Sequence, residues 1–205
     1  MDALLNDFRH NLSELLNRAS GISDAGIVAA DKISTRLCEG KADIRESISE
    51  TQNPLEDALD LHVRQSADIN PDCLALLSSL HALSGYLSWY KRSNATANDF
   101  NAGHANAEIL GPKGLEVRDD VLVGVTLMRP NLTYPDHHHP PEEVYVVLSP
   151  GLWRQNDDPW WSPGVGGYVY NAPDILHAMK SENTPLCAIW CLNLTNVNRD
   201  FSLAT

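Results

Sequence analysis

Residues 134–148 (YPDHHHPPEEVYVVL) hold the side chains of this chain that are best suited to bind a metal ion. His137, His139, Glu143 and Tyr145 all have odd numbers, and side chains of an extended segment alternate between two faces. These four groups would therefore project from one face, with apolar valines on the other. Imidazole nitrogen and carboxylate oxygen suit zinc, iron, manganese, nickel or cobalt. The pattern predicts a metal site.

A fifth candidate ligand, His177, follows in the segment NAPDILHAM. A connection rich in glycine and proline separates it from the first stretch, so we expect the site to be assembled from two strands. His138 and Glu142 have the opposite orientation, and we expect Glu142 to be a solvated charge. The remaining histidines are interpreted as ordinary helix or loop residues: His10, His62, His81 and His104.

The elements that must position these residues are strands in the second half of the chain. The segments 121–128, 143–148, 167–172 and 187–194 are short, rich in β-branched and aromatic residues, and separated by proline and glycine turns. Such spacing favours an antiparallel barrel or jelly roll. We therefore expect an α+β protein, in which residues 101–205 form a barrel with the metal site and residues 1–100 form a helical region that packs on or over it.

The first half of the chain has helical periodicity. Apolar residues recur every three or four positions in 4–16, and a second apolar stripe in 27–37 predicts a helix that ends near Gly40. The pairs Asn53-Pro54 and Asn70-Pro71 each place a capping side chain before a proline at the first helical position. The second pair opens what we expect to be the longest helix, ending at Trp89 and Tyr90. The polar segment 93–107 is predicted to be a loop.

Composition limits the classes of partner. The chain has 205 residues, a formal charge of −12 and a pI of about 4.9, so phosphate backbones would be repelled and nucleic acid is not an expected partner. We expect no membrane span and no signal peptide, because no long apolar run occurs. Four cysteines without a CxxC pair predict buried, free thiols and a reducing cytoplasm: Cys38, Cys73, Cys187 and Cys191.

Two short segments resemble the cupin motifs. HHHPPEEVYVVL contains H-x-H-x-x-x-E, the first motif, and the segment 167–177 resembles the second. This chain departs from the pattern at Pro150, where the first motif closes with glycine, and at Ile175, where the second motif has its inner glycine. His177 also comes one residue early. The resemblance implies a cupin double-stranded β-helix, that is, a jelly-roll barrel.

The whole chain more closely resembles the cupin dimethylsulfoniopropionate lyases of the DddQ type. The likeness is carried by its length, its helical N-terminal half, Tyr145 two residues after the ligand glutamate, and the upstream Tyr134. It implies one divalent transition metal, such as zinc, iron or manganese. His137 would serve either as a ligand or as a group that handles a proton. The metal ligands implied by the resemblance are His139, Glu143, Tyr145 and His177.

The same resemblance implies cleavage of a small zwitterionic sulfonium compound, dimethylsulfoniopropionate, to acrylate and dimethyl sulfide. The metal would bind the substrate carboxylate, and Tyr145, activated as a phenolate, would remove the α-proton. Among the aromatic residues near the barrel, Tyr134 is expected to line the pocket, where its ring face would attract the sulfonium.

Two other functions compete with the lyase. One is a different cupin metalloenzyme, such as an iron-dependent dioxygenase or an isomerase, although an oxygenase has no need of a phenol such as Tyr145 at its metal. The other is a non-catalytic cupin that binds a small molecule. The acidic N-terminal half offers no basic recognition helix that would favour a DNA-binding sensor. No feature of the sequence selects an oligomeric state.

Overall fold

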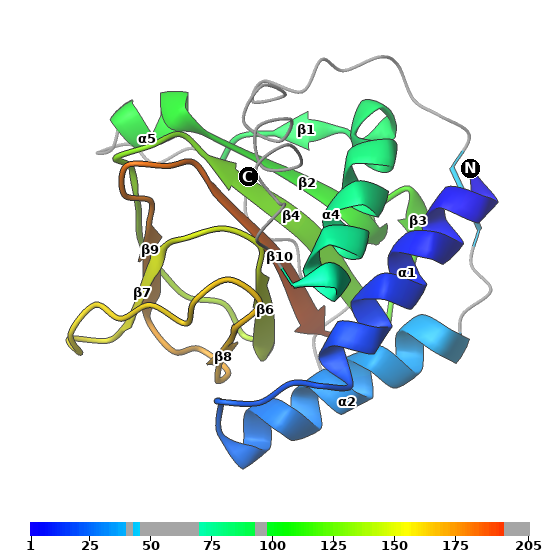
Figure 1. Cartoon of the computed structure of the whole chain (residues 1–205), viewed down its shortest axis with the longest axis horizontal. Coiled ribbons are helices and arrows are strands. Elements are labelled where there is room, and N and C mark those ends of the chain that lie inside the picture. The colour runs from blue at the N-terminus through cyan, green and yellow to red at the C-terminus, as the bar shows by residue number, and fades with distance from the viewer. Residues whose placement is uncertain (40–42, 46–69, 93–97, 195–205) are drawn as a thin grey trace.

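The computed structural model describes residues 1–39, 43–45, 70–92 and 98–194. Three layers make up this part of the chain: helices, a large β-sheet and a small β-sheet (Figure 1). The helix predicted after Asn53-Pro54, and His62 within that segment, lie outside the described residues. None of the described helices combines the length and apolar character that a membrane crossing requires.

Three helices form the outer layer: α1 (Asp2–Leu16), α2 (Asp24–Glu39) and α4 (Pro71–Leu83). The predicted apolar stripe of α1 is buried, and α2 ends where glycine follows it, as predicted. One member of the α2 stripe, Ile27, is 42% exposed instead. The side chain of Asn70 caps α4 by accepting a hydrogen bond from the backbone nitrogen of Asp72 at 3.0 Å, which confirms the predicted start of this helix.

The end of α4 was predicted wrongly. The helix has 13 residues, fewer than the 16 of α2, and it passes into a short 3₁₀ helix, η2 (Ser84–Tyr86). Trp89 and Tyr90 form strand β1 and pair with Ala107 and Asn106. Gly85 weakens the helix at this point, and the two aromatic residues gain more by pairing with the sheet than by continuing a helix.

The predicted loop at 93–107 is also wrong for the residues that the structure describes. Residues 98–103 form helix α5 (Asn98–Gly103), and residue 104 begins strand β2 (His104–Gly111). Ala105 and Ala107 of this strand are fully buried. The small side chains that suggested a loop therefore fill positions where the interior has little room.

The large sheet has the strand order β1-β2-β4-β10-β6-β8, in which each neighbouring pair is antiparallel. A further short strand, β3 (Glu116–Val117), runs parallel to β2. Every residue of β4 and of β10 is buried, because helices cover one face of the sheet and the small sheet covers the other. The remaining strands are β4 (Val121–Met128), β6 (Glu143–Val147), β8 (Tyr168–Asn171) and β10 (Leu186–Asn193).

The small sheet has the order β5-β9-β7 and is antiparallel throughout. Its strands are β5 (Thr133–His137), β7 (Leu152–Gln155) and β9 (His177–Lys180). A second apolar cluster, distinct from the one under the helices, includes residues from both sheets, such as Met179 from β9 and Trp190 from β10. The predicted α+β class with a double-sheet jelly roll is confirmed.

Candidate metal centre

The candidate ligands come from three strands in two sheets, whereas the sequence pattern had predicted two strands. His137 ends β5, Glu143 begins β6 and His177 begins β9. The turn between β5 and β6 contains Pro140 and Pro141, which cannot donate ladder hydrogen bonds and interrupt the extended segment. The chain therefore passes from the small sheet to the large one within this stretch.

Alternation of faces holds within β6. Val144 and Val146 belong to the apolar cluster under the helices, whereas Tyr145 and Val147 belong to the cluster between the sheets. The ligand face of β6 is therefore the face that looks into the barrel, as the odd numbering predicted.

His139, Glu143 and His177 form a buried group whose potential ligand atoms all lie within 4.8 Å of one another. The Nε2 atom of each histidine is 3.4 Å from Oε2 of Glu143. Nε2 of His177 is buried and has no hydrogen-bond partner in the described structure. A buried nitrogen without a partner is costly, but it is the atom that a metal ion would engage. The donor set therefore fits a divalent transition metal.

The orientation of the histidine rings supports the same conclusion. Each ring places Nδ1 at 2.9 Å from the carbonyl oxygen of a residue two positions away. Donation from Nδ1–H to a carbonyl leaves Nε2 with its lone pair free, which is the usual arrangement of a metal-binding histidine. The three pairs are His137 with Pro135, His139 with Pro141 and His177 with Ile175.

The Glu143 carboxyl is held in its charged form. Burial alone would raise its pKa, but His139 and His177, together with a 2.9 Å hydrogen bond from Nδ2 of Asn171, outweigh that effect and lower the pKa to about 2. A carboxylate that stays ionised in a buried place is suited to bind a cation.

His137 lies beside the group without joining it. Its ring centroid is 4.1 Å from that of His177 and 6.4 Å from that of His139. Burial, and then the neighbouring His177 and Arg92, keep its pKa well below the ordinary histidine value. His137 therefore faces the site as a neutral imidazole.

Two tyrosines share the buried wall beside the ligands. Tyr145 is 3% exposed, and burial, followed by the charge of Glu143, raises its pKa well above the ordinary value, while Arg92 acts in the opposite direction. Tyr134 is 4% exposed and its hydroxyl accepts a hydrogen bond from Nη1 of Arg92 at 3.2 Å. Burial also raises the pKa of Tyr134.

A cavity of about 20 Å³, room for about one water molecule, lies next to these side chains. The predicted site residues Tyr134, His137, His139, Glu143 and Tyr145 line it. Tyr90 and Trp190, two aromatic residues that the sequence left open as pocket walls, also line it. Sequence reasoning missed Arg92, Asn106 and Thr126, although Thr126, the one hydroxyl in the apolar segment VLVGVTLM, was a usable signal.

Several side chains differ from their predicted surroundings. Glu142 is not a solvated charge: its carboxylate accepts hydrogen bonds from Tyr170 Oη at 3.2 Å and from Asn193 Nδ2 at 2.9 Å. His104 is a fully buried strand residue that stacks on Phe100 with ring centroids 3.7 Å apart. All four cysteines are free, as predicted, but Cys38 is exposed.

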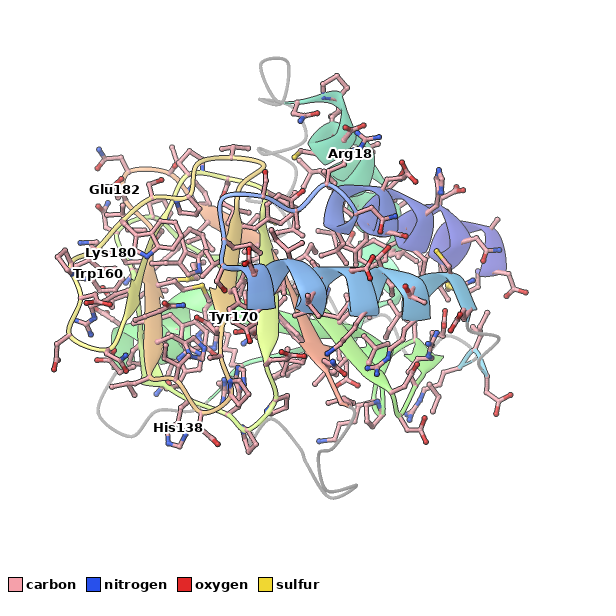
Figure 2. The ribbon with its side chains drawn as sticks, turned by 90° about the horizontal axis from the view of Figure 1, so that it is seen from below. Arg18, His138, Trp160, Tyr170, Lys180 and Glu182 are labelled. Atoms are coloured by element: carbon pink, nitrogen blue, oxygen red, sulfur yellow. The ribbon has the colours of Figure 1, made fainter. Side chains whose placement is uncertain are left out.

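Other predictions about side chains near the site are confirmed. His138 is exposed and lies at the edge of the molecule (Figure 2). His10 and His81 are exposed helix residues. Trp160 lies on the outside of the barrel, where it contacts Lys180 (Figure 2), and the Lys180 Nζ is 4.8 Å from the ring centroid. Trp160 is not among the residues that line the cavity beside Tyr134.

Comparisons with known proteins agree on one family. The dimethylsulfoniopropionate lyase family profile matches residues 28–188. A putative dimethylsulfoniopropionate lyase, DddL of Cereibacter sphaeroides, is 29% identical over 112 residues, which cover 54% of this chain. The match spans about half of that relative, 47% of its length.

Two solved structures share the fold. The lyase DddQ of Ruegeria pomeroyi DSS-3 superimposes with a TM-score of 0.71 at 19% identity, covering 97% of this chain and 95% of that one. A chain from the crystal structures of the lyases RdDddP and RnDddQII superimposes with a TM-score of 0.69, also at 19% identity, covering 94% of this chain and 93% of that one. At this level of identity the likeness establishes the fold.

The double-sheet jelly roll, with two histidines and a glutamate converging between its sheets, places this chain in the cupin fold class. Within that class, the lyase family profile covers most of the chain. The protein belongs to the dimethylsulfoniopropionate lyase family, whose members are carbon–sulfur lyases.

Proposed function

We propose that this protein cleaves dimethylsulfoniopropionate to acrylate and dimethyl sulfide. Family membership supports the reaction class. The observation that carries the proposal is the position of Tyr145, a buried phenol two residues after Glu143, on the wall of the cavity that His139 also lines. A metal site alone would suit many cupins, whereas a phenol beside it supplies a base.

His139, Glu143 and His177 would hold one divalent ion, with Tyr145 as a further ligand and His137 either as a ligand or as a proton carrier. Zinc, iron and manganese all suit this donor set. When bound, such an ion supplies Lewis acidity toward the substrate carboxylate and stabilises negative charge at the adjacent carbon.

Tyr145 would act as the base. A free tyrosine has a pKa of about 10 and is a weak base at neutral pH, and burial makes its phenolate still harder to form. Positive charge facing the ring, including the guanidinium of Arg92, favours the phenolate. The phenolate oxygen takes the α-proton, and the C–H electron pair becomes the C=C bond of acrylate. The C–S pair leaves with sulfur as neutral dimethyl sulfide, so no general acid is required.

Tyr134 would present its ring to the sulfonium, since aromatic faces attract cations that have no N–H donors. The cavity of about 20 Å³ is smaller than the substrate. Side chains of its wall must therefore move when the substrate enters.

The test is the release of dimethyl sulfide into the headspace above metal-loaded protein that has been given dimethylsulfoniopropionate. We expect Tyr145→Phe to abolish release while it retains much of the substrate affinity, because the ring stays and only the proton acceptor is lost. Tyr86→Phe, at a 40% exposed tyrosine, is the matched control and should keep full activity. Full activity of Tyr145→Phe would refute its role as the base.

The alternative cupin enzymes predict a different outcome of the same assay. A dioxygenase would consume oxygen with another substrate and release no dimethyl sulfide, and that pair of results would overturn the lyase. We also propose a cytoplasmic location, which the four free thiols support.

A further inference from the structure

Arg92 is a charged residue of the cavity wall to which the mechanism above gives no substrate contact. It lies two residues after the end of β1, and its backbone N–H donates to Nε2 of His104 at 3.0 Å, which anchors the main chain there. Its side chain lines the cavity and makes the 3.2 Å hydrogen bond to Tyr134. None of the ion pairs among the described residues includes Arg92.

Arg118, a buried guanidinium of this fold, has different partners from the partly buried Arg92. Arg118 pairs with Glu116 at 3.1 Å and with Asp120 at 2.8 Å. An arginine side chain remains charged at all ordinary pH values, and removing it from water without an anion is costly. A guanidinium with five N–H donors that faces a cavity and has one phenol partner is therefore prepared for an anionic ligand.

A carboxylate is the anion that fits this surrounding. The planar guanidinium matches the two oxygens of a carboxylate, which it can bind through two parallel hydrogen bonds. Tyr90, Tyr134 and Trp190 also line this cavity and would flank the part of the ligand that follows the carboxylate.

We propose that Arg92 binds the carboxylate of the substrate together with the metal ion and makes the site selective for carboxylate ligands over uncharged ones. The assignment of the natural ligand rests on the proposed function. For a zwitterion, Arg92 also fixes the direction of binding, because it attracts the carboxylate end and repels the sulfonium end. The sulfonium then meets the aromatic walls, and the α-carbon lies between the two ends.

The experiment measures carboxylate binding without turnover. Metal-loaded protein is titrated with propionate in a calorimeter, for the wild type, Arg92→Gln and Arg92→Lys. We expect Arg92→Gln to weaken propionate binding by about ten- to hundredfold, the range for charge-assisted hydrogen bonds. Arg92→Lys should lose less propionate affinity, because lysine keeps the positive charge but not the planar pair of N–H donors. Metal content and melting temperature, measured on each variant, show that the site is still assembled.

Arg18→Gln is the matched control, since Arg18 lies at the surface of the helical layer (Figure 2), pairs with Asp72 and does not line the cavity. It should bind propionate as the wild type does. Propionamide, which lacks the charge, should bind wild type and Arg92→Gln equally. Propionate affinity of Arg92→Gln within twofold of the wild type, or no propionate binding by the wild type, would overturn the proposal.

A purely structural role of Arg92, in which it only orients Tyr134, gives a different result in a double-mutant cycle. If Arg92 acts through that tyrosine, Arg92→Gln causes no further loss of propionate binding in a Tyr134→Phe background. If Arg92 binds the carboxylate, the loss persists in that background. Only the second result supports the proposal.

Two results distinguish the carboxylate site at Arg92 from the lyase activity. If propionate binding depends on Arg92 but the wild type releases no dimethyl sulfide, the carboxylate site is supported and the lyase function is contradicted. If Arg92→Gln releases dimethyl sulfide with an unchanged KM for dimethylsulfoniopropionate, the lyase function is supported and the carboxylate site is contradicted.

Discussion

The Glu143 carboxylate is held in position by an amide whose orientation is itself fixed. Nδ2 of Asn171 donates to Oε2 of Glu143 at 2.9 Å, while Oδ1 of Asn171 accepts from Nε2 of Gln155 at 2.8 Å. Gln155 also donates to the carbonyl of Tyr170 at 2.6 Å. The chain of donors runs from the small sheet, through β8, to the carboxylate oxygen of the candidate ligand, so that Oε2 faces His139 and His177.

We therefore predict that Asn171→Ala weakens metal affinity by about ten- to hundredfold, the usual effect of losing a partner of a metal ligand. Competition with a chromophoric chelator measures this affinity. Asn11→Ala is the control, because Asn11 hydrogen-bonds to Ala75 in the helical layer and should leave metal affinity unchanged. Equal affinities of wild type and Asn171→Ala would mean that Glu143 needs no such support.

At the scale of elements, the helical layer is joined to the sheet through a buried ion-pair cluster. Glu116 of β3 is 1% exposed and lies 3.2 Å from Arg9 of α1 and 3.1 Å from Arg118. Nη2 of Arg118 in turn donates to the carbonyl of Arg36 in α2 at 2.9 Å. One carboxylate thus connects two helices to the edge of the sheet.

Glu116→Ala should lower the free energy of unfolding by about 3 kcal/mol, since removing one partner of a buried pair leaves charge uncompensated. Urea denaturation of the metal-loaded protein measures this difference. Asp72→Ala, which removes an exposed pair with Arg18, is the control and should cost less than about 1 kcal/mol. Similar losses in the two variants would contradict a special role for Glu116.

The errors of sequence-based prediction share a physical cause at this scale. The apolar stripe of α1, the Asn70 cap and the alternation within β6 follow from local patterns, and all three were predicted correctly. Strand β1 depends on pairing with β2, and β2 depends on pairing with β4, and neighbouring residues encode neither contact.

The same distinction applies to the candidate site. His139, Glu143 and His177 could be selected as candidate ligands because their side chains have the right chemistry at a recognisable spacing, and the structure brings the three together. Arg92 and Asn106 could not be assigned to the site, because they reach the cavity only through the pairing of β1 with β2. Trp190 reaches it from β10, where the absence of a side chain at Gly124 makes room for its ring.

For the whole molecule, the candidate metal centre connects the two sheets. Glu143 belongs to β6 of the large sheet, His177 to β9 of the small sheet, and His139 to the turn that joins them. An ion that binds these three residues would therefore cross-link the sheets, and it would bind the folded chain far better than the unfolded one, in which the ligands are separated.

Metal removal should consequently destabilise the fold. Metal at about 1,000 times its Kd stabilises the native state by about 4 kcal/mol, which corresponds to a rise in Tm of about 10 °C for a chain of this size. Calorimetric scans of the protein before and after treatment with a chelator measure the shift. His138→Ala, at an exposed histidine outside the ligand group, should keep the full shift, whereas His177→Ala should lose it because one ligand is missing. A Tm that is the same with and without metal in the wild type would show that the two sheets do not depend on the ion. The centre would then act in binding and chemistry alone.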